Sequence, residues 1–258
     1  MNIREALSLG DRGVVSIVGA GGKSSLMYSL ANELVSAGRK VLTTTTTKIF
    51  MPTLDESPAT IVSGIPEEII EKAEILLGNY SHLTVGSEYL QAHDKLNGLE
   101  PSVIEYILQS GLFDYIIVEA DGAARRSLKA CAPHEPVVPL FSDCIVALVG
   151  LDVVAKTLTE EQVFNSSIFA RITGLELMQD VTESSIASIM LHDMSSITVT
   201  GKKCMKIAFL NKADNLKALK TGERISAFIE KGGKGIFHRV VIGELRAEQA
   251  IQQCRVMQ

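Results

Sequence analysis

Short runs of aliphatic and β-branched residues alternate with longer segments of helical periodicity along almost the whole chain. The runs predict buried strands, and the longer amphipathic segments predict helices between them. The predicted strands are Val14–Val18, Lys40–Thr44, Thr60–Val62, Leu83–Val85, Tyr115–Glu119, Ile145–Val149, Lys206–Leu210 and Val240–Ile242. The predicted helices lie near 23–37, 66–77, 101–110, 160–172, 182–192 and 215–231.

Strands that are apolar along their whole length are typical of a parallel sheet covered on both faces. We therefore expect an α/β fold, a doubly wound and mostly parallel sheet with helices on both faces. Linkers rich in Pro, Gly or Ser are too short to force a boundary, so we expect one domain over residues 1–258. The alternative is that the segment after about residue 150 forms a smaller C-terminal subdomain.

The composition narrows the classes of protein. The net charge is −5, without a cluster of Lys and Arg, which argues against binding to nucleic acid. Apolar runs fall short of the roughly 18 residues that a membrane span needs, and the N-terminus lacks the apolar core of a secretion signal. The 4 cysteines form no CxxC pair and are typical of reduced thiols. We expect a cytoplasmic protein that binds neither nucleic acid nor membrane.

The segment VVSIVGAGGKSS, residues 14–25, carries the strongest chemical signal. A strand, a glycine-rich turn, Lys-Ser and a helix follow one another as in a phosphate-binding loop, so we expect a fold of the P-loop NTPase type. Glycines let backbone amides face an anion, and the helix N-terminus adds partial positive charge. Lys23 would neutralise phosphate oxygens, and Ser24 would ligate Mg²⁺. The residues expected to contact the nucleotide phosphates are Gly19, Ala20, Gly21, Gly22, Lys23, Ser24 and Ser25.

This loop departs from the standard pattern G-x-x-x-x-G-K-[ST] at one position. Ile17 stands where the pattern has its first glycine, and the glycines are crowded late in the turn. The alternative is a glycine-rich strand-to-helix turn that binds no anion.

Acidic residues end the predicted strand Tyr115–Glu119, which continues into Ala120, Asp121 and Gly122. Carboxylates at the carboxyl edge of a parallel sheet would lie beside the phosphate loop and could hold Mg²⁺. We therefore expect Asp121 or Glu119 to hold the metal, and we name Lys23, Glu119 and Asp121 as candidate catalytic residues. The spacing from Glu119 to Gly122 also fits an acid-x-x-Gly switch. The alternative is a strand that ends in a polar turn.

The sequence Asn211-Lys212-Ala213-Asp214 follows a buried strand and matches the N-K-x-D pattern that reads guanine in GTPases. The Asp214 carboxylate would accept from guanine N1–H and the 2-amino group, a donor pair that adenine lacks. Asn211 would tie this loop to the phosphate loop, and the Lys212 stem would lie against the base. The alternative is that Asp214 caps the following helix.

Two further polar stretches lie beside these motifs. The run Thr43–Lys48 ends the second strand, where Thr46 or Thr47 could supply a Mg²⁺ ligand, although threonine also simply favours strands. The basic stretch 125–129 could stabilise the charge of a transferred phosphoryl group or bind an anionic partner, or it could be a solvated loop. We expect the irregular segment 122–140 to be a structured loop at the site.

These blocks, in this order, resemble the YqeC family, accessory proteins of selenium-dependent molybdenum hydroxylases. The resemblance is carried by GAGGKSS at 19–25, TTTTTKIF at 43–50, VEADGAARRSLKA at 118–130, HEPVVP at 134–139, GLD at 150–152, ITGL at 172–175 and NKAD at 211–214. It implies a cytoplasmic nucleotide-binding protein that serves maturation of such a hydroxylase, whose partner is that enzyme or its maturation machinery. The analogy with metallocentre-assembly GTPases adds a homodimer as a possible assembly.

The sequence thus leads to a Mg²⁺-dependent nucleoside triphosphatase, with GTP favoured over ATP as the bound nucleotide. Two other functions stay open. One is an ATP-dependent kinase or ligase, in which the threonine run and the basic stretch would face an acceptor. The other is a nucleotide-responsive scaffold with negligible turnover.

Overall fold

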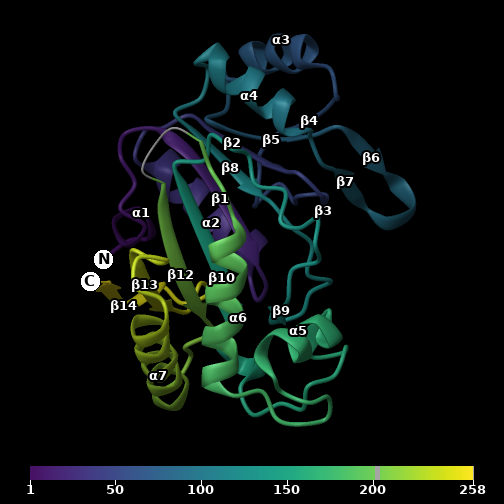
Figure 1. Ribbon diagram of the computed structural model, residues 1–258. Helices are drawn as coiled ribbons and strands as arrows, with labels where there is room; N and C mark the ends of the chain where they lie inside the picture. The colour runs from purple at the N-terminus through teal and green to yellow at the C-terminus, as the bar shows by residue number, and fades with distance from the viewer. Residues whose placement is uncertain (201–203, 258) are drawn as a thin grey trace.

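A nine-stranded sheet forms the centre of the molecule in the computed structural model, which describes residues 1–200 and 204–257 (Figure 1). Its strands are β1 (Gly13–Gly19), β2 (Val41–Thr45), β4 (Thr60–Val62), β5 (His82–Gly86), β8 (Tyr115–Glu119), β10 (Cys144–Gly150), β12 (Met205–Asn211), β13 (Arg239–Gly243) and β14 (Ile251–Val256). They are ordered β14-β13-β12-β10-β1-β8-β2-β5-β4. All neighbours pair in parallel except β14, which runs antiparallel to β13.

Helices cover both faces of this sheet. They are α1 (Ile3–Ala6), α2 (Lys23–Ser36), α3 (Pro66–Leu76), α4 (Pro101–Ser110), α5 (Ser166–Thr173), α6 (Glu183–Ser196) and α7 (Leu216–Gly232). Alternate residues of β1 enter two different apolar clusters, Val15 and Ile17 one, Val14 and Val18 the other. The first cluster includes α1 and α2, and the second includes α3 to α7. The predicted doubly wound α/β fold is confirmed.

Every predicted strand is found, and most predicted helices agree to within a residue or two at their ends. The helix predicted over 160–172 is wrong at its start, because α5 begins only at Ser166. Glu160 lies in the loop before α5, and its carboxylate accepts hydrogen bonds from the amides of Asn165 and Ser166 at the start of that helix. In that loop, β11 (Val163–Phe164) pairs with β9 (Leu128–Lys129). The helix predicted over 182–192 continues to Ser196.

Several short elements have no counterpart in the prediction. A separate antiparallel sheet contains β3 (Lys48–Phe50), β6 (Glu88–Leu90) and β7 (Lys95–Asn97), with the 3₁₀ turn η1 (Gln91–His93) between the last two. A second 3₁₀ turn, η2 (Leu151–Val153), follows β10. Strands β12 to β14 continue the main sheet, so the segment after residue 150 shares that sheet. Among residues 1–200 and 204–257, no helix is both long and apolar enough to cross a membrane.

The sheet topology gathers the predicted motifs at one edge. Strands β1, β8, β10 and β12 are adjacent and parallel, so the loops after their carboxyl ends lie side by side. The register pairs Ile17 with Glu119 and Gly150 with Asn211. Ligands of doubly wound folds bind at this edge of the sheet.

Candidate functional site

The turn between β1 and α2 has a backbone that requires glycine. Gly19, Gly21 and Gly22 have φ values of +89°, +86° and +126°. A Cβ atom on Gly19 would lie 2.3 Å from the Leu148 carbonyl oxygen, and one on Gly21 would lie 2.3 Å from the Gly150 nitrogen. Both contacts are with backbone atoms of β10, which cannot move aside. The glycines therefore let the turn lie directly on the end of the neighbouring strand.

Only the last part of the turn has amides that can face a ligand. Three earlier amides donate to the protein: Gly19 to Asp121 Oδ2 (2.9 Å), Ala20 to the Leu148 carbonyl (2.9 Å) and Gly21 to the Arg126 carbonyl (3.0 Å). Within the described residues, the amides of residues 22–25 have no hydrogen-bond acceptor. These are the free N–H groups of the first turn of α2, the kind of group that binds anions at a helix N-terminus. The amide surface is thus shorter than the predicted range 19–25.

Lys23 and Ser24 contact the two predicted acids. Lys23 Nζ donates to the Gly19 carbonyl at 2.8 Å and lies 3.1 Å from Asp121 Oδ1 and 3.7 Å from Glu119 Oε1. Ser24 Oγ donates to Glu119 Oε2 at 2.8 Å. Asp121 is completely buried, and the exposed fraction of Glu119 is 7%. The structure therefore brings all the candidate catalytic residues into one cluster.

Burial governs the electrostatics of this cluster. Loss of solvation raises the pKa of Glu119 above its usual range, although the neighbouring Lys23 ammonium and the Ser24 hydroxyl oppose that shift. Asp121 Oδ1 is buried and accepts no hydrogen bond in the described structure, and its contact with Lys23 is an ion pair without hydrogen-bond geometry. The acceptor capacity of this carboxylate is thus only partly used.

A second buried lysine, at the end of the basic stretch 125–129, completes the cluster. Lys129 Nζ lies 3.2 Å from Asp121 Oδ2 and donates to Glu135 Oε2 and to the Gly122 carbonyl, both at 2.8 Å. Burial lowers the pKa of Lys129, but the neighbouring carboxylates of Asp121 and Glu135 outweigh it and raise the pKa overall. The sequence of the basic stretch 125–129 does not show which of its cationic side chains is buried and which is exposed to solvent.

The N-K-x-D loop is joined to the glycine turn. Asn211 Nδ2 donates to the Gly21 carbonyl at 2.8 Å, and Asn211 Oδ1 accepts from the Leu245 amide at 3.1 Å. The predicted tie between the two loops is therefore present. Lys212 adopts φ +65° and donates to Ser127 Oγ and Asp152 Oδ2 at 2.7 and 2.9 Å.

Asp214 does not cap the helix that follows it. The N-cap of α7 is Asn215, whose side chain accepts from the Ala218 amide at 3.0 Å. The Asp214 carboxylate is exposed and accepts from Asn215 Nδ2 at 2.8 Å. The capping alternative is thus wrong, and this carboxylate faces solvent beside the loop that holds Gly21.

The threonine run and the basic stretch lie at the same edge. The Thr46 amide donates to the Glu119 carbonyl at 3.2 Å, and its hydroxyl donates to the Val137 carbonyl at 2.8 Å. No hydrogen bond in the described structure joins Thr46 to Ser24 or Asp121, and its role as a metal ligand stays a prediction. Ser25 is exposed. In the basic stretch, the Arg125 guanidinium stacks on Phe50, 4.2 Å from the ring centroid.

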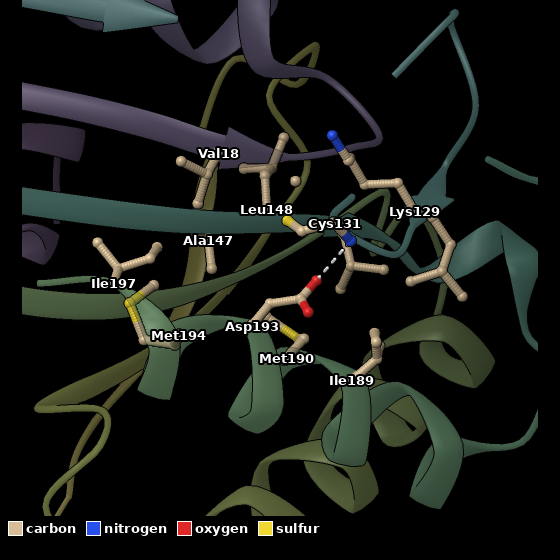
Figure 2. Close-up of a pocket in the computed structure, with 13 residues that line it drawn as sticks. Val18, Lys129, Cys131, Ala147, Leu148, Ile189, Met190, Asp193, Met194 and Ile197 are labelled. Atoms are coloured by element: carbon tan, nitrogen blue, oxygen red, sulfur yellow. Dashed lines mark hydrogen bonds between the residues drawn. The ribbon is translucent and has the colours of Figure 1, made fainter. Parts of the chain in front are cut away.

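A cavity of about 30 Å³ lies behind the glycine turn, between the sheet and α6. Figure 2 shows it lined by apolar side chains, with Asp193 directed toward the Cys131 amide, to which it is hydrogen-bonded at 3.1 Å. Lys129 forms one wall, and its ammonium points away from α6. This volume holds one or two water molecules and is far too small for a nucleotide. The candidate nucleotide site is the open edge of the sheet.

Comparison with known proteins identifies relatives of this chain. A family profile described as "YqeC protein" matches residues 15–167. The uncharacterized protein YqeC of Escherichia coli (strain K12) is 33% identical over 200 residues, which cover 77% of this chain and 75% of that protein. Among solved structures, FtsY from Mycoplasma mycoides aligns over 95% of this chain at 10% identity, with a TM-score of 0.27. This chain spans 63% of that structure's length, and such a low score adds nothing to the fold described above.

Proposed function

The chain belongs to the YqeC family, and from this premise we propose that it is a Mg²⁺-dependent nucleotide-binding protein that acts as a GTPase. The observation that carries the proposal is the hydrogen bond from Asn211 to the Gly21 carbonyl, which joins an N-K-x-D loop directly to a glycine turn. One bound nucleotide can therefore contact both loops at once.

The phosphates would bind at the start of α2. The amides of residues 22–25, which have no acceptor in the described structure, would bind the anion together with the positive end of the helix dipole. The Lys23 ammonium would exchange its contacts with Asp121 and the Gly19 carbonyl for β- and γ-phosphate oxygens. This exchange replaces an ion pair and one charge-assisted hydrogen bond with contacts to phosphate oxygens, so the buried cation stays paired.

The donor set fits Mg²⁺. This cation takes one or two protein oxygens and completes its shell with water and phosphate oxygens. Ser24 Oγ and the Glu119 carboxylate are already 2.8 Å apart, and Asp121 Oδ1 is a buried carboxylate oxygen that accepts no hydrogen bond in the described structure. In the proposed complex, Ser24 with Asp121 or Glu119 holds the metal, which would neutralise charge on the phosphates. Thr46 is a further candidate ligand.

The N-K-x-D loop would select the base. The exposed Asp214 carboxylate would accept from guanine N1–H and the 2-amino group, and adenine, which lacks this donor pair, would not make these two hydrogen bonds. The Lys212 stem would lie against the base. Its ammonium is restrained by Asp152 at 2.9 Å, a contact that keeps the stem beside the loop.

Catalysis in this proposal is positioning and charge stabilisation. Lys23 would hold the transferred phosphoryl group, and Glu119 is the first candidate to orient the attacking water. In the cell, we propose that the nucleotide cycle serves the maturation of a selenium-dependent molybdenum hydroxylase, the role that the family resemblance implies.

The phosphate assignment is tested by calorimetric titration of the full chain with MgGTP, in the wild type and in Lys23→Ala. We expect a loss of affinity of at least about 100-fold, since a buried charge-assisted contact is removed. Lys206→Met is the matched control, because Lys206 is a half-buried lysine that donates to the Met194 and Ile197 carbonyls, away from the glycine turn. Equal affinity of Lys23→Ala and the wild type would contradict the proposal.

Hydrolysis separates the GTPase from a scaffold. Phosphate release should be measured for the chain alone and with a candidate hydroxylase partner, because a GTPase that needs an activator turns over slowly by itself. Firm binding with negligible hydrolysis in both cases would favour the nucleotide-responsive scaffold.

A further inference from the structure

Asp121 is shared by two lysines whose surroundings differ. Its Oδ1 atom lies 3.1 Å from Lys23 Nζ, while its Oδ2 atom lies 3.2 Å from Lys129 Nζ and accepts from the Gly19 amide at 2.9 Å. The side chain has no exposed surface, so its charge depends entirely on these neighbours. If Lys23 moves to the phosphates, as proposed above, Asp121 loses one of its two cations.

Lys129 is held where it is. The exposed fraction of its side chain is 1%, and its ammonium donates hydrogen bonds to Glu135 and to the Gly122 carbonyl and forms an ion pair with Asp121. Its backbone belongs to β9, which pairs with β11 outside the main sheet. Lys129 therefore cannot follow Lys23 toward a ligand, and it stays as the counterion of Asp121.

The same ammonium also holds the backbone of the acid-x-x-Gly segment. It donates to the Gly122 carbonyl at 2.8 Å, and Gly122 has no neighbouring atom within 4 Å of the position that a Cβ would take. The peptide at Gly122 is thus free of side-chain packing on that side and is restrained by this hydrogen bond. One buried cation therefore contacts both the Asp121 carboxylate and the Gly122 peptide, and the Gly19 amide is the other donor to the same carboxylate oxygen.

We propose that Lys129 is the positioning residue of the nucleotide site, which keeps the Asp121 carboxylate and the Gly122 carbonyl in place when Lys23 exchanges Asp121 for phosphate. This inference rests on the proposed function. Residues that orient metal ligands from behind change metal affinity by roughly 10–100-fold when they are removed. Lys129 occupies that place behind Asp121, on the side away from Lys23.

The test is the Mg²⁺ dependence of GTP binding by the full chain, measured by calorimetry in the wild type, Lys129→Met and Lys129→Arg. The Mg²⁺ midpoint is the Mg²⁺ concentration at which half of the metal-dependent increase in GTP affinity is reached. In Lys129→Met we expect this midpoint to rise roughly tenfold or more. Lys129→Arg keeps a cation and should recover most of this shift. The control Lys206→Met should lower thermal stability and leave the Mg²⁺ midpoint unchanged.

A second variant covers the case in which Lys129→Met does not fold. Glu135→Gln weakens the contact that holds Lys129 and changes a side chain that is 17% exposed, so it should fold and shift the Mg²⁺ midpoint in the same direction by a smaller factor. Wild-type midpoints in both Lys129→Met and Glu135→Gln would overturn the role of Lys129, while loss of binding in Lys23→Ala would still support the phosphate site. Absence of GTP binding by the wild type at any Mg²⁺ concentration would overturn both proposals.

Discussion

The side-chain amide of Asn211 donates a 2.8 Å hydrogen bond to the carbonyl oxygen of Gly21, which lies 190 positions earlier in the chain. Asn211 is 4% exposed, and its Oδ1 atom accepts a hydrogen bond from the backbone amide of Leu245. This one side chain therefore fixes the glycine turn, the loop after β12 and the loop after β13 relative to one another. A nucleotide that bridges phosphate and base sites would depend on that spacing.

Replacing Asn211 with alanine should destabilise the protein and weaken nucleotide binding together. The change leaves the Gly21 carbonyl and the Leu245 amide buried without their partner, so we expect a loss of about 2–4 kcal/mol in the free energy of unfolding. Urea unfolding measures that loss, and calorimetric titration with MgGTP measures the affinity. Asn32→Ala, on the exposed face of α2, should change neither quantity. Full stability of Asn211→Ala would contradict the account of the joined loops.

Glycine-to-alanine substitutions should separate backbone strain from steric overlap. Gly10 has no neighbour within 4 Å of the position that a Cβ would take and no positive φ, so Gly10→Ala should cost nothing measurable. Gly38 has φ +77° in open space, and Gly38→Ala should cost about 1–2 kcal/mol for the left-handed backbone. Gly21→Ala combines φ +86° with a 2.3 Å overlap on the Gly150 nitrogen and should cost at least about 3 kcal/mol.

This series is measured by urea unfolding of the single variants. The order of the losses should be Gly21, then Gly38, then Gly10. Equal losses for Gly21→Ala and Gly38→Ala would show that the turn can move away from β10, contrary to the close contact seen here.

His82 should make the protein less stable at mildly acidic pH. It is 2% exposed, its Nε2 lies 3.0 Å from Thr43 Oγ1, and burial lowers its pKa from 6.5 to about 4. Between these two values the unfolded chain binds a proton at this histidine and the folded chain does not. The free energy of unfolding should therefore fall by about 1 kcal/mol per unit as the pH drops from roughly 6 to 5.

The contribution of His82 is isolated by comparing the wild type with His82→Gln in urea unfolding at several pH values. Glutamine does not titrate and can still contact Thr43, so the stability of the variant should depend less steeply on pH. Parallel pH curves for the two proteins would show that His82 takes up its proton in the folded state as easily as in the unfolded one.

Local sequence patterns predicted the strands of the main sheet except β14, and most helices, because these strands are rich in aliphatic and β-branched residues and are bounded by turn residues. They also predicted the contact between Asn211 and the phosphate loop, since the two motifs follow β12 and β1, parallel strands that are separated only by β10. The helix over 160–172 was placed wrongly because the strand pairing of Val163 with Leu128 depends on a distant segment. Short pairings of this kind leave no periodic signal.

The buried role of Lys129 was also beyond sequence reasoning. In the sequence it follows Arg125 and Arg126 in a basic run, but the structure places Arg125 on Phe50 and Lys129 beneath Asp121. What decides between these outcomes is the path of the loop after β8. The sequence also did not show that the amides of Gly19, Ala20 and Gly21 donate hydrogen bonds within the protein. Their acceptors come from other strands and loops.

The most direct test of the central claim is calorimetric titration of the nucleotide-free protein with GTP and with ATP, each with Mg²⁺, in the wild type, Asp214→Ala and Asn215→Ala. We predict that the wild type prefers GTP and that Asp214→Ala loses this preference at wild-type stability, because Asp214 does not cap α7. Asn215→Ala should lose about 1 kcal/mol of stability and keep the preference. A preference for ATP that Asp214→Ala leaves unchanged would contradict the account and favour a kinase or ligase.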